Sequence, residues 1–291
     1  MKRGSDQVIF NIIGYGVLGL IAGLMIVPFG VLIGSSFASE QDIVLHGYSI
    51  IPRDVSLEAY GLIFENPQKL LQAYGVTILI TVVGTGVSLF ISAMSAYVLS
   101  RKSLRYRNGL AFFLYFTILF PAPLLPYFIL ITNVLHLRNT LLVLILVPMF
   151  YVMYLFILRS FIKSIPDSMF EAAQIDGAGE FRIFIQIVLP LMKPALASIG
   201  LFLALRYWND WWTAMMFVDK EPLQPLQYAL YRILSSVNAA AHLISNVPTF
   251  EMPKETLKLA MTVVSTGPII LIYPFVQRFF VKGVTLGAVK G

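Results

Sequence analysis

The sequence is poor in charged residues and contains no cysteine. Only 12% of its 291 residues are charged and 58% are hydrophobic, whereas soluble globular domains carry roughly 25% charged residues. This deficit of charge excludes a protein that must dissolve in water. The absence of cysteine excludes disulfides and thiolate metal sites. The three histidines lie far apart in the sequence, so we expect no metal site.

Several motifs of nucleotide binding and catalysis are also missing. The sequence has no G-x-x-x-x-G-K-[ST] phosphate loop, no H-E-x-x-H pair and no G-x-S-x-G nucleophile motif. Without a phosphate loop the chain cannot bind ATP by that device. We therefore expect no catalytic residue and no cofactor on this chain, and any work across a membrane needs a partner or an ion gradient.

Six long apolar segments are present, at Phe10–Ser35, Gln72–Leu99, Leu110–Val134, Leu141–Phe161, Leu191–Val218 and Thr256–Val281. A hydrocarbon core about 30 Å thick needs roughly 20 apolar residues per helical span, and helices satisfy their own backbone hydrogen bonds in lipid. We therefore predict an all-α polytopic membrane protein with about six transmembrane helices. The first segment is too long for the h-region of a signal peptide, about 7–15 residues, so we interpret it as an uncleaved span.

The basic residues predict the orientation of these spans. The densest basic segment, residues 101–107, belongs on the cytoplasmic side by the positive-inside rule. Both termini then lie in the cytoplasm, most basic residues lie on the same side, and most acids lie outside. This topology explains the excess of basic residues that gives the net charge of +6. A nucleic-acid partner is not expected, because such proteins carry a clustered basic face on a soluble fold.

Two outer loops are long, from Phe37 to Leu71 and from Asp219 to Pro253. They are either plain connections or contacts for a partner outside the membrane. No internal repeat is visible, which argues mildly against a secondary transporter. The one clear acid within the spans, Asp210, lies near a membrane face. This position disfavours proton coupling, because ion-coupled pumps usually keep carboxylates inside their spans.

A polar segment between the fourth and fifth spans carries the most information. We predict a short helix that begins at Ser164, three residues before Asp167, with Pro166 in its first turn, where a missing N–H is tolerated. It is expected to stop at Gly177 and Gly179. A second short helix is expected from about Glu180 to Leu189, ended by Pro190. A helix lying on the membrane needs a basic polar face. This segment is acidic instead, which favours docking to a protein partner.

Three parts of this segment resemble a known motif. They are Glu171-Ala172-Ala173, Asp176-Gly177-Ala178 and Ile187-Val188-Leu189-Pro190. Their spacing is similar to the EAA loop of type I ATP-binding-cassette (ABC) importer permeases, and the resemblance extends from about the second span to the end of the chain. The tail, residues 281–291, resembles the ending of the carbohydrate branch, in particular the G-type subunits of maltose permeases.

The resemblance implies contacts with an ATPase subunit. The short helix would be the coupling helix, seated in a cleft of the ATPase, with coupling residues Glu171, Ala172, Ala173, Asp176 and Gly177. Glu171 would form charge-assisted hydrogen bonds with a basic residue of the ATPase. The C-terminal tail would also contact the ATPase subunits, through Gly283, Gly287 and Lys290.

The resemblance also implies an assembly and a task. The partners would be a second permease subunit, giving a heterodimer, two ATP-binding subunits that hold ATP and Mg, and an extracellular solute-binding protein. Membrane lipid surrounds the chain, and the location is the bacterial cytoplasmic membrane. The chain would be a permease for an oligosaccharide or another carbohydrate, not an enzyme, and would work by alternating access driven by ATP hydrolysis in its partners.

The fifth span contains Arg206-Tyr207-Trp208-Asn209-Asp210-Trp211-Trp212. Arg206 and Asp210 are four residues apart and are expected to pair on one helix face. The tryptophans suit an aromatic belt at the interface or stacking against sugar rings. A place in the substrate pathway is a guess for Tyr207, Asn209 and Asp210. The third span carries three prolines, Pro121, Pro123 and Pro126, which predict a kink.

We divide the chain into a first span with its outer loop (1–71), a permease core (72–281) with a coupling loop (163–190), and a cytoplasmic tail (282–291). Three other functions stay open. They are an importer permease for a non-sugar solute, an ion-driven secondary carrier, and a membrane scaffold that transports nothing.

Overall fold

The computed structural model describes residues 5–244 and 253–270. These residues fall into two compact units, one within Met1–Pro67 and Leu230–Ile269, the other within Gln68–Ala229 and Ile270–Gly291. The described ranges hold no strand beyond an isolated antiparallel bridge between Ala38 and Val55. The predicted all-helical class is therefore confirmed for this part of the chain.

The first unit contains the long N-terminal helix, the segment that follows it and two helices from the C-terminal part of the sequence. Its helices are α1 (Ser5–Ser36), α2 (Glu40–His46), α3 (Glu58–Phe64), most of α14 (Leu226–Ile244) and a helix at residues 254–270. The Glu40 carboxylate accepts the backbone N–H groups of Glu255 and Thr256 at 2.9 and 3.0 Å. These donors have no partner within their own helix, so Glu40 fixes the start of helix 254–270 beside α2.

The segment after α1 folds back onto the end of that helix. A Cβ atom at Gly34 would lie 2.0 Å from the carbonyl oxygen of Ile50, so only glycine permits this approach. The Asp42 carboxylate accepts the backbone N–H of Arg53 at 2.8 Å. The outer loop predicted from Phe37 to Leu71 is thus an ordered segment with two short helices.

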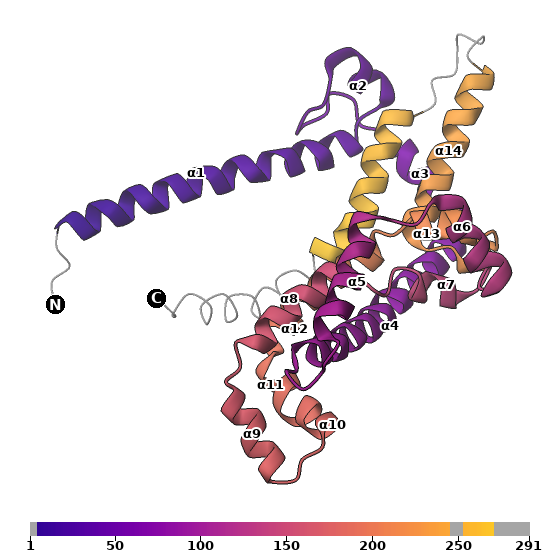
Figure 1. The fold of residues 1–291 in the computed structure, drawn as a ribbon. Helices are drawn as coiled ribbons and strands as arrows, with labels where there is room; N and C mark the ends of the chain where they lie inside the picture. The colour runs from indigo at the N-terminus through magenta and orange to yellow at the C-terminus, as the bar shows by residue number, and fades with distance from the viewer. Residues whose placement is uncertain (1–4, 245–252, 271–291) are drawn as a thin grey trace. The chain divides into compact units, whose positions relative to one another are not determined.

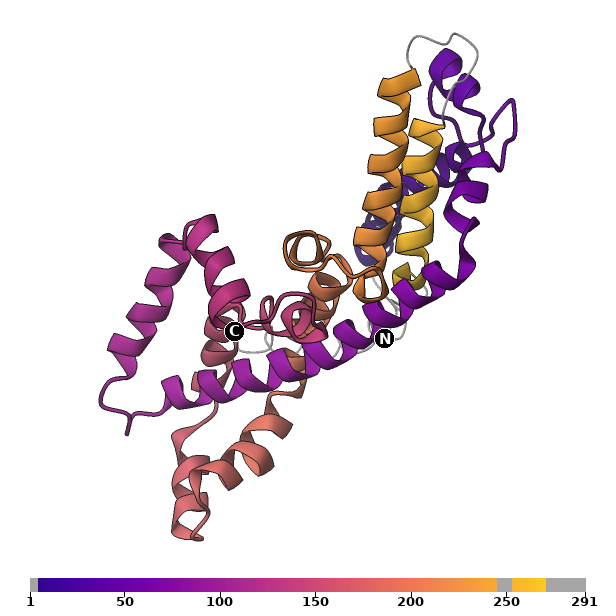
Figure 2. The same cartoon turned by 90° about the vertical axis from the view of Figure 1, so that its right-hand side faces the viewer.

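The second unit is a continuous series of helices, shown from two directions in Figures 1 and 2. In chain order these are α4 (Pro67–Ser100), α5 (Arg107–Leu119), α6 (Leu124–Ile129), the π-helical η1 (Leu130–Val134), α7 (Leu141–Leu146), α8 (Val152–Lys163), α9 (Asp167–Ile175), α10 (Glu180–Ile183), the π-helical η2 (Phe184–Val188), α11 (Leu189–Leu191), α12 (Lys193–Trp208), α13 (Trp212–Phe217), the 3₁₀ turn η3 (Glu221–Leu223) and the first turn of α14.

Helix α4 packs through a stripe of small residues. Its buried positions recur at helical spacing and include Thr77, Gly84, Ser88, Ser92 and Ala96. Small side chains allow the backbones of neighbouring membrane helices to approach closely. At Gly84 the neighbour is the ring of Tyr207, which is fully buried and whose hydroxyl donates to the Ile145 carbonyl at 2.7 Å. The stripe therefore joins α4 to α12.

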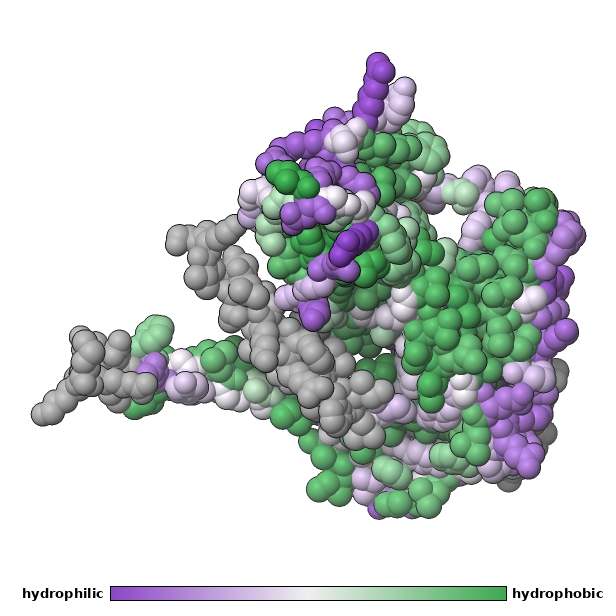
Figure 3. Space-filling model, turned by 90° about the horizontal axis from the view of Figure 1, so that it is seen from below, coloured by the Kyte–Doolittle hydropathy of each residue, from purple (hydrophilic) through white to green (hydrophobic). Residues whose placement is uncertain are grey.

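Within residues 5–244 and 253–270, two helices are long and apolar enough to cross a membrane, at Phe10–Ser36 and Pro67–Ser100. Two bent pairs of helices bring the number to four if each pair is one span. Figure 3 shows broad apolar areas on the visible face, which suit contact with lipid. The predicted count of six spans and the predicted side of the termini stay predictions.

The prolines of the third predicted span coincide with a sharp break. Arg107–Leu119 and Leu124–Val134 meet at 112°, and Pro121 and Pro123 lie between them. The predicted kink is confirmed. The loop predicted from Asp219 to Pro253, in contrast, contains α14. Polar residues interrupt the apolar run in α14, so the search for long apolar segments missed this helix.

Replacing Gly84 by alanine should destabilise the protein. The added methyl group would lie 2.5 Å from two ring carbons of Tyr207, and overpacking a close-packed core typically costs about 1–3 kcal/mol. Thermal unfolding of the purified protein in detergent measures the change. Gly86→Ala, on the same helix, is the matched control, because nothing lies within 4 Å of its added Cβ. Equal losses of thermal stability in both variants would contradict the assigned contact.

Candidate functional site

Helices α9 and α10 form a hairpin that contains the predicted coupling residues. Helix α9 starts at Asp167, directly after Pro166. The predicted start at Ser164 was wrong: Ser164 is the C-cap of α8 instead, and its hydroxyl donates to the Phe161 carbonyl at 2.7 Å. It stops where Gly177 adopts a φ of +75°, the left-handed conformation that glycine accepts without strain. The N–H of Ala178 then donates to the carbonyl of Ala173 at 2.9 Å. Gly179 has an ordinary extended φ of −69° and is the residue that precedes α10.

The second helix of the hairpin departs from its prediction. The chain stays helical from Glu180 through α10, η2 and α11 to Leu191, and the bend of 82° into α12 comes at Met192. Pro190 lies in the first turn of α11 rather than ending the helix. A proline inside a helical stretch removes an N–H that would otherwise bond within the helix, and here the wider π-helical turn of η2 precedes it. The prediction that Pro190 ends this helix was wrong.

The hairpin is tied to the C-terminal end of α4 by one carboxylate. Glu180 accepts hydrogen bonds from the Tyr97 hydroxyl, from Arg101 at 3.1 Å and from Gln174 at 3.2 Å. The Arg101 guanidinium also stacks over the Phe170 ring, 4.9 Å from its centroid. Cation–π contacts of this kind add attraction beyond the ion pair. Both helices of the hairpin are thereby attached to α4.

A second ion pair ties the start of α9 to the segment after α4. Lys102 Nζ lies 2.5 Å from Asp167 Oδ2, and both side chains are exposed. The hydrogen bond and the positive charge of Lys102 lower the pKa of Asp167 below its usual value of 3.8. The carboxylate therefore stays ionised at physiological pH, and acid alone would release this pair only below that value.

The predicted coupling residues are divided between two sides of α9 and its turn. Glu171, Ala172, Asp176 and Gly177 are exposed. Ala173 is 9% exposed and packs into the core beneath α9, next to Phe170. The structure thus places four of the five on an open surface, and the small side chain of Ala173 allows α9 to lie close to its own core. Their contact with an ATPase stays a prediction.

Two apolar residues near the tip of the hairpin were not identified from the sequence. Ile175 is 86% exposed and Phe181 is 64% exposed. Both lie on the polar hairpin that follows α8, and the Phe181 ring keeps one contact with the buried Phe184, with 6.5 Å between the ring centroids. The helical spacing of Phe170 and Ala173 identifies the buried face, so Ile175 could have been recognised as lying off it. Exposed apolar groups rimmed by polar residues are typical of protein contacts.

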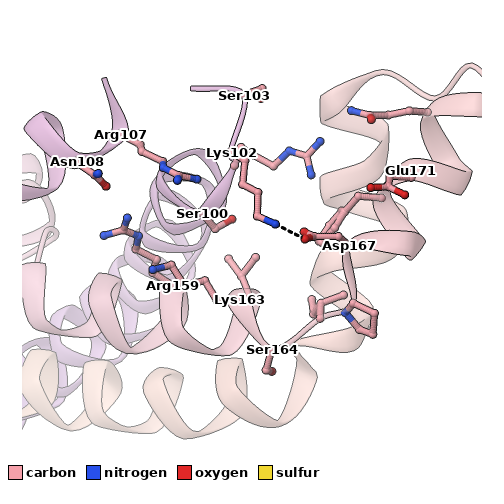
Figure 4. Close-up of a pocket in the computed structure, with 16 residues that line it drawn as sticks. Ser100, Lys102, Ser103, Arg107, Asn108, Arg159, Lys163, Ser164, Asp167 and Glu171 are labelled. Atoms are coloured by element: carbon pink, nitrogen blue, oxygen red, sulfur yellow. Dashed lines mark hydrogen bonds and ion pairs between the residues drawn. The ribbon is translucent and has the colours of Figure 1, made fainter. Parts of the chain in front are cut away.

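A cavity of about 720 Å³ lies between the hairpin and the ends of α4, α5 and α8 (Figure 4). It is rich in cations; its charged lining residues are Arg101, Lys102, Arg107, Arg159, Lys163, Asp167 and Glu171. The described part of the chain contains no group of histidine, aspartate and glutamate side chains suited to a metal ion.

A second cavity, of about 590 Å³, lies where α12 ends and α13 begins. Asn209 and Asp210 line it, whereas Tyr207 does not. Tyr207 is fully buried, and its hydroxyl contacts Ser88 and Ile145. Of the three residues guessed for the substrate pathway, the structure brings two to a cavity. Their contact with substrate stays a prediction.

Arg206 and Asp210 do not pair, contrary to the prediction from their spacing. Helix α12 ends at Trp208, so the two residues no longer share a helix face. Arg206 stacks over the Tyr151 ring at 4.5 Å, and Asp210 accepts the backbone N–H of Thr213 at 3.0 Å. Both side chains line the second cavity, where Arg206 has no carboxylate partner among the described residues.

The tryptophans of this region are divided between core and cavity. Trp208 is buried at 6% exposure, whereas Trp211 and Trp212 are each 39% exposed and line the second cavity. The latter two can therefore meet lipid or a ligand. The predicted tail residues Gly283, Gly287 and Lys290 lie outside the described residues.

Comparisons with known proteins agree on one family. The model of the "Binding-protein-dependent transport system inner membrane component" family matches residues 88–286. The polygalacturonan/rhamnogalacturonan transport system permease protein YtcP of Bacillus subtilis is 38% identical, over 97% of this chain and 99% of the relative. The arabinooligosaccharides transport system permease protein AraQ of Halalkalibacterium halodurans is 28% identical over the full length of both.

A solved structure is also similar. It is a chain of a bacterial ABC transporter involved in the import of the acidic polysaccharide alginate. The two chains are 30% identical, with a TM-score of 0.75 over 96% of this chain and 99% of the other. The likeness therefore extends over nearly the whole chain.

Glu180→Gln should loosen the hairpin from α4. The substitution removes the charge that Arg101 pairs with, and a half-exposed ion pair of this kind contributes roughly 1 kcal/mol. We expect backbone hydrogen exchange in residues 167–183 to become a few-fold faster, measured by mass spectrometry. Asp176→Asn is the control, because Asp176 is exposed and its side chain forms no hydrogen bond or ion pair with the described residues. The same acceleration in the control would refute the anchoring role of Glu180.

Proposed function

We infer the function of this chain from its family, because it belongs to the inner membrane components of binding-protein-dependent transport systems. It is a multi-pass membrane protein and the permease subunit of an ABC importer. Its task is therefore to form a path for a solute.

We propose that the chain assembles with a second permease subunit, two ATP-binding subunits and an extracellular solute-binding protein. The family description names a binding protein, and the chain has no phosphate loop of its own. ATP and Mg then bind to the partner subunits, and hydrolysis takes place there. This chain converts the resulting motion into alternating access.

The α9–α10 hairpin is the observation that supports this division of labour. Its open surface offers Glu171 and the apolar Ile175 and Phe181, which suits contact with a protein. Its other side is attached to α4 through Glu180. A partner that moves the hairpin therefore also moves α4, one of the two helices that are long enough to cross a membrane unaided.

The cargo we propose is an oligosaccharide. The relatives named above are described as transporting oligosaccharides or polysaccharides. The second cavity offers the exposed indoles of Trp211 and Trp212, flat apolar surfaces of the kind that stack against sugar rings, together with the side-chain amide of Asn209. We propose that this cavity contributes to the substrate pathway.

An acidic sugar would find a cation in this cavity. Arg206 has no carboxylate partner among the described residues, and an unpaired charge within a membrane segment is unfavourable unless it has a function. Asp210 also lines the cavity, but its Oδ1 accepts the N–H of Thr213. Arg206 is therefore the side chain suited to a carboxylate of the cargo, because guanidinium groups bind carboxylates with two parallel hydrogen bonds.

Glu171→Lys should uncouple the transporter without removing it from the membrane. Reversing the charge places like charges opposite one another at the contact with the ATPase, and losing a close interfacial charge pair costs about 2 kcal/mol or more. We expect the stimulation of ATP hydrolysis by the loaded binding protein to fall about tenfold or more in proteoliposomes. Glu171→Asp is the control, because it keeps the negative charge at the same exposed position of α9 and should keep most of the stimulation.

Three results would contradict the proposal. If Glu171→Lys keeps full stimulation, α9 is not the coupling element. If the chain transports solute in liposomes without ATPase subunits, an ion-driven carrier replaces the importer. Absence of any flux in the complete complex would favour a scaffold.

Arg206→Gln should lower the transport of an acidic oligosaccharide more than that of a neutral one. A hydrogen bond to a charged group contributes about 1.5 kcal/mol or more, so we expect about a tenfold difference in uptake rates between the two cargoes. Arg138→Gln is the control, because Arg138 is already paired with Asp219 and does not line the cavity. An equal decrease for both cargoes would show that Arg206 does not recognise charge.

A further inference from the structure

Three cations of the first cavity have no ion-pair partner among the described residues. Lys102 pairs with Asp167 and Arg101 with Glu180, which leaves Arg107, Arg159 and Lys163. Figure 4 shows these three on the wall opposite α9, away from Glu171. The charges of Arg107 and Arg159 repel one another. Residues 271–291 contain no aspartate or glutamate that could neutralise them. This wall of the cavity is therefore suited to an anion.

An apolar groove of about 450 Å³ lies between the same two helices, α5 and α8. Its lining residues are Ala111, Phe112, Tyr115, Ile118, Met153 and Phe156. Several of these side chains are widely exposed, for example Phe112 at 67% and Met153 at 54%. All of its lining residues belong to α5 or α8.

Helical spacing makes the groove a continuation of the cationic wall. On α5, Arg107, Ala111, Tyr115 and Ile118 follow one another at steps of four, four and three residues, so they share one face. On α8, Met153, Phe156, Arg159 and Lys163 do the same at steps of three, three and four. Each helix thus carries its cations at the end next to the first cavity and its groove residues further along.

The dimensions of this paired surface match one leaflet of a bilayer. Arg107 and Ile118 are eleven residues apart, which is roughly 16 Å along an α-helix at about 1.5 Å per residue. A leaflet provides about half of the 30 Å hydrocarbon core. The cations also lie on the side that the positive-inside rule assigns to the cytoplasm, where the leaflet is rich in anionic lipids.

We propose that an anionic phospholipid binds between α5 and α8, with its phosphate group at Arg107, Arg159 and Lys163 and an acyl chain in the groove. The Nε of Arg159 is already engaged with the Leu99 carbonyl at 3.0 Å, which leaves its two terminal nitrogens for the phosphate. Arg107 and Lys163 provide further positive charge. The site is next to the coupling hairpin but does not require it to bind an ATPase.

The test measures phosphatidylglycerol that stays bound to the purified importer complex in phosphatidylcholine nanodiscs, by lipid mass spectrometry. The variant Arg107→Gln with Lys163→Gln removes two cations and leaves Arg159 on Leu99. Each cation near an anionic leaflet contributes about fivefold to binding, so we expect about 30-fold weaker retention. Arg105→Gln with Arg182→Gln is the matched control, because it removes two exposed cations that do not line the cavity.

A second variant tests the groove without changing charge. Ala111→Phe places a ring in the groove and should also weaken retention of phosphatidylglycerol, with recovery of the complex as the check on folding. The proposal is overturned if the charge variant retains the lipid, or if the control loses it equally. It is also overturned if the complex binds inorganic phosphate at these cations but retains no phosphatidylglycerol, since the site then binds phosphate alone. Loss of the ATPase subunits with unchanged lipid would assign the cations to a protein partner and overturn it as well.

Discussion

The carboxylate of Glu180 is the group on which the arrangement of the second unit depends. It joins Tyr97 and Arg101 of the α4 end to Gln174 and to the start of α10. Phe170 packs beneath the same guanidinium, so charge and apolar contact act at one point. The polar hairpin is thereby attached to α4, a helix that is long and apolar enough to cross a membrane.

The stripe on α4 extends this attachment along the helix. Because Gly84 has no side chain, Tyr207 of α12 can lie against the α4 backbone and reach the Ile145 carbonyl. Polar groups buried away from water usually find partners within the protein. The Tyr207 hydroxyl is such a partner for the Ile145 carbonyl of α7. Three segments far apart in sequence are thus held together, and the cavity lined by Arg206 lies beside the residue that joins them.

The sequence predicted some parts of this structure well because local chemistry decides them. The left-handed turn at Gly177 and the break at Pro121 and Pro123 depend on the few residues concerned. The pairing of Arg206 with Asp210 was predicted wrongly because it assumed that α12 continues past Trp208. The prediction for Pro190 considered only that proline tends to end helices. It did not foresee the π-helical turn η2, after which the helix continues through Pro190. Helical spacing separates the face of Ala173 from that of Ile175, but which of the two faces is buried depends on tertiary packing.

The exposure of Ile175 and Phe181 has a consequence for assembly. A copy of this chain that has not met its partners holds two bare apolar side chains at the end of a polar hairpin, where lipid cannot cover them. Transiently exposed apolar surface is what makes unassembled proteins prone to aggregation and to capture by chaperones and proteases. The two side chains that we propose for the contact with a partner are therefore also the ones that an unassembled copy leaves open to such capture.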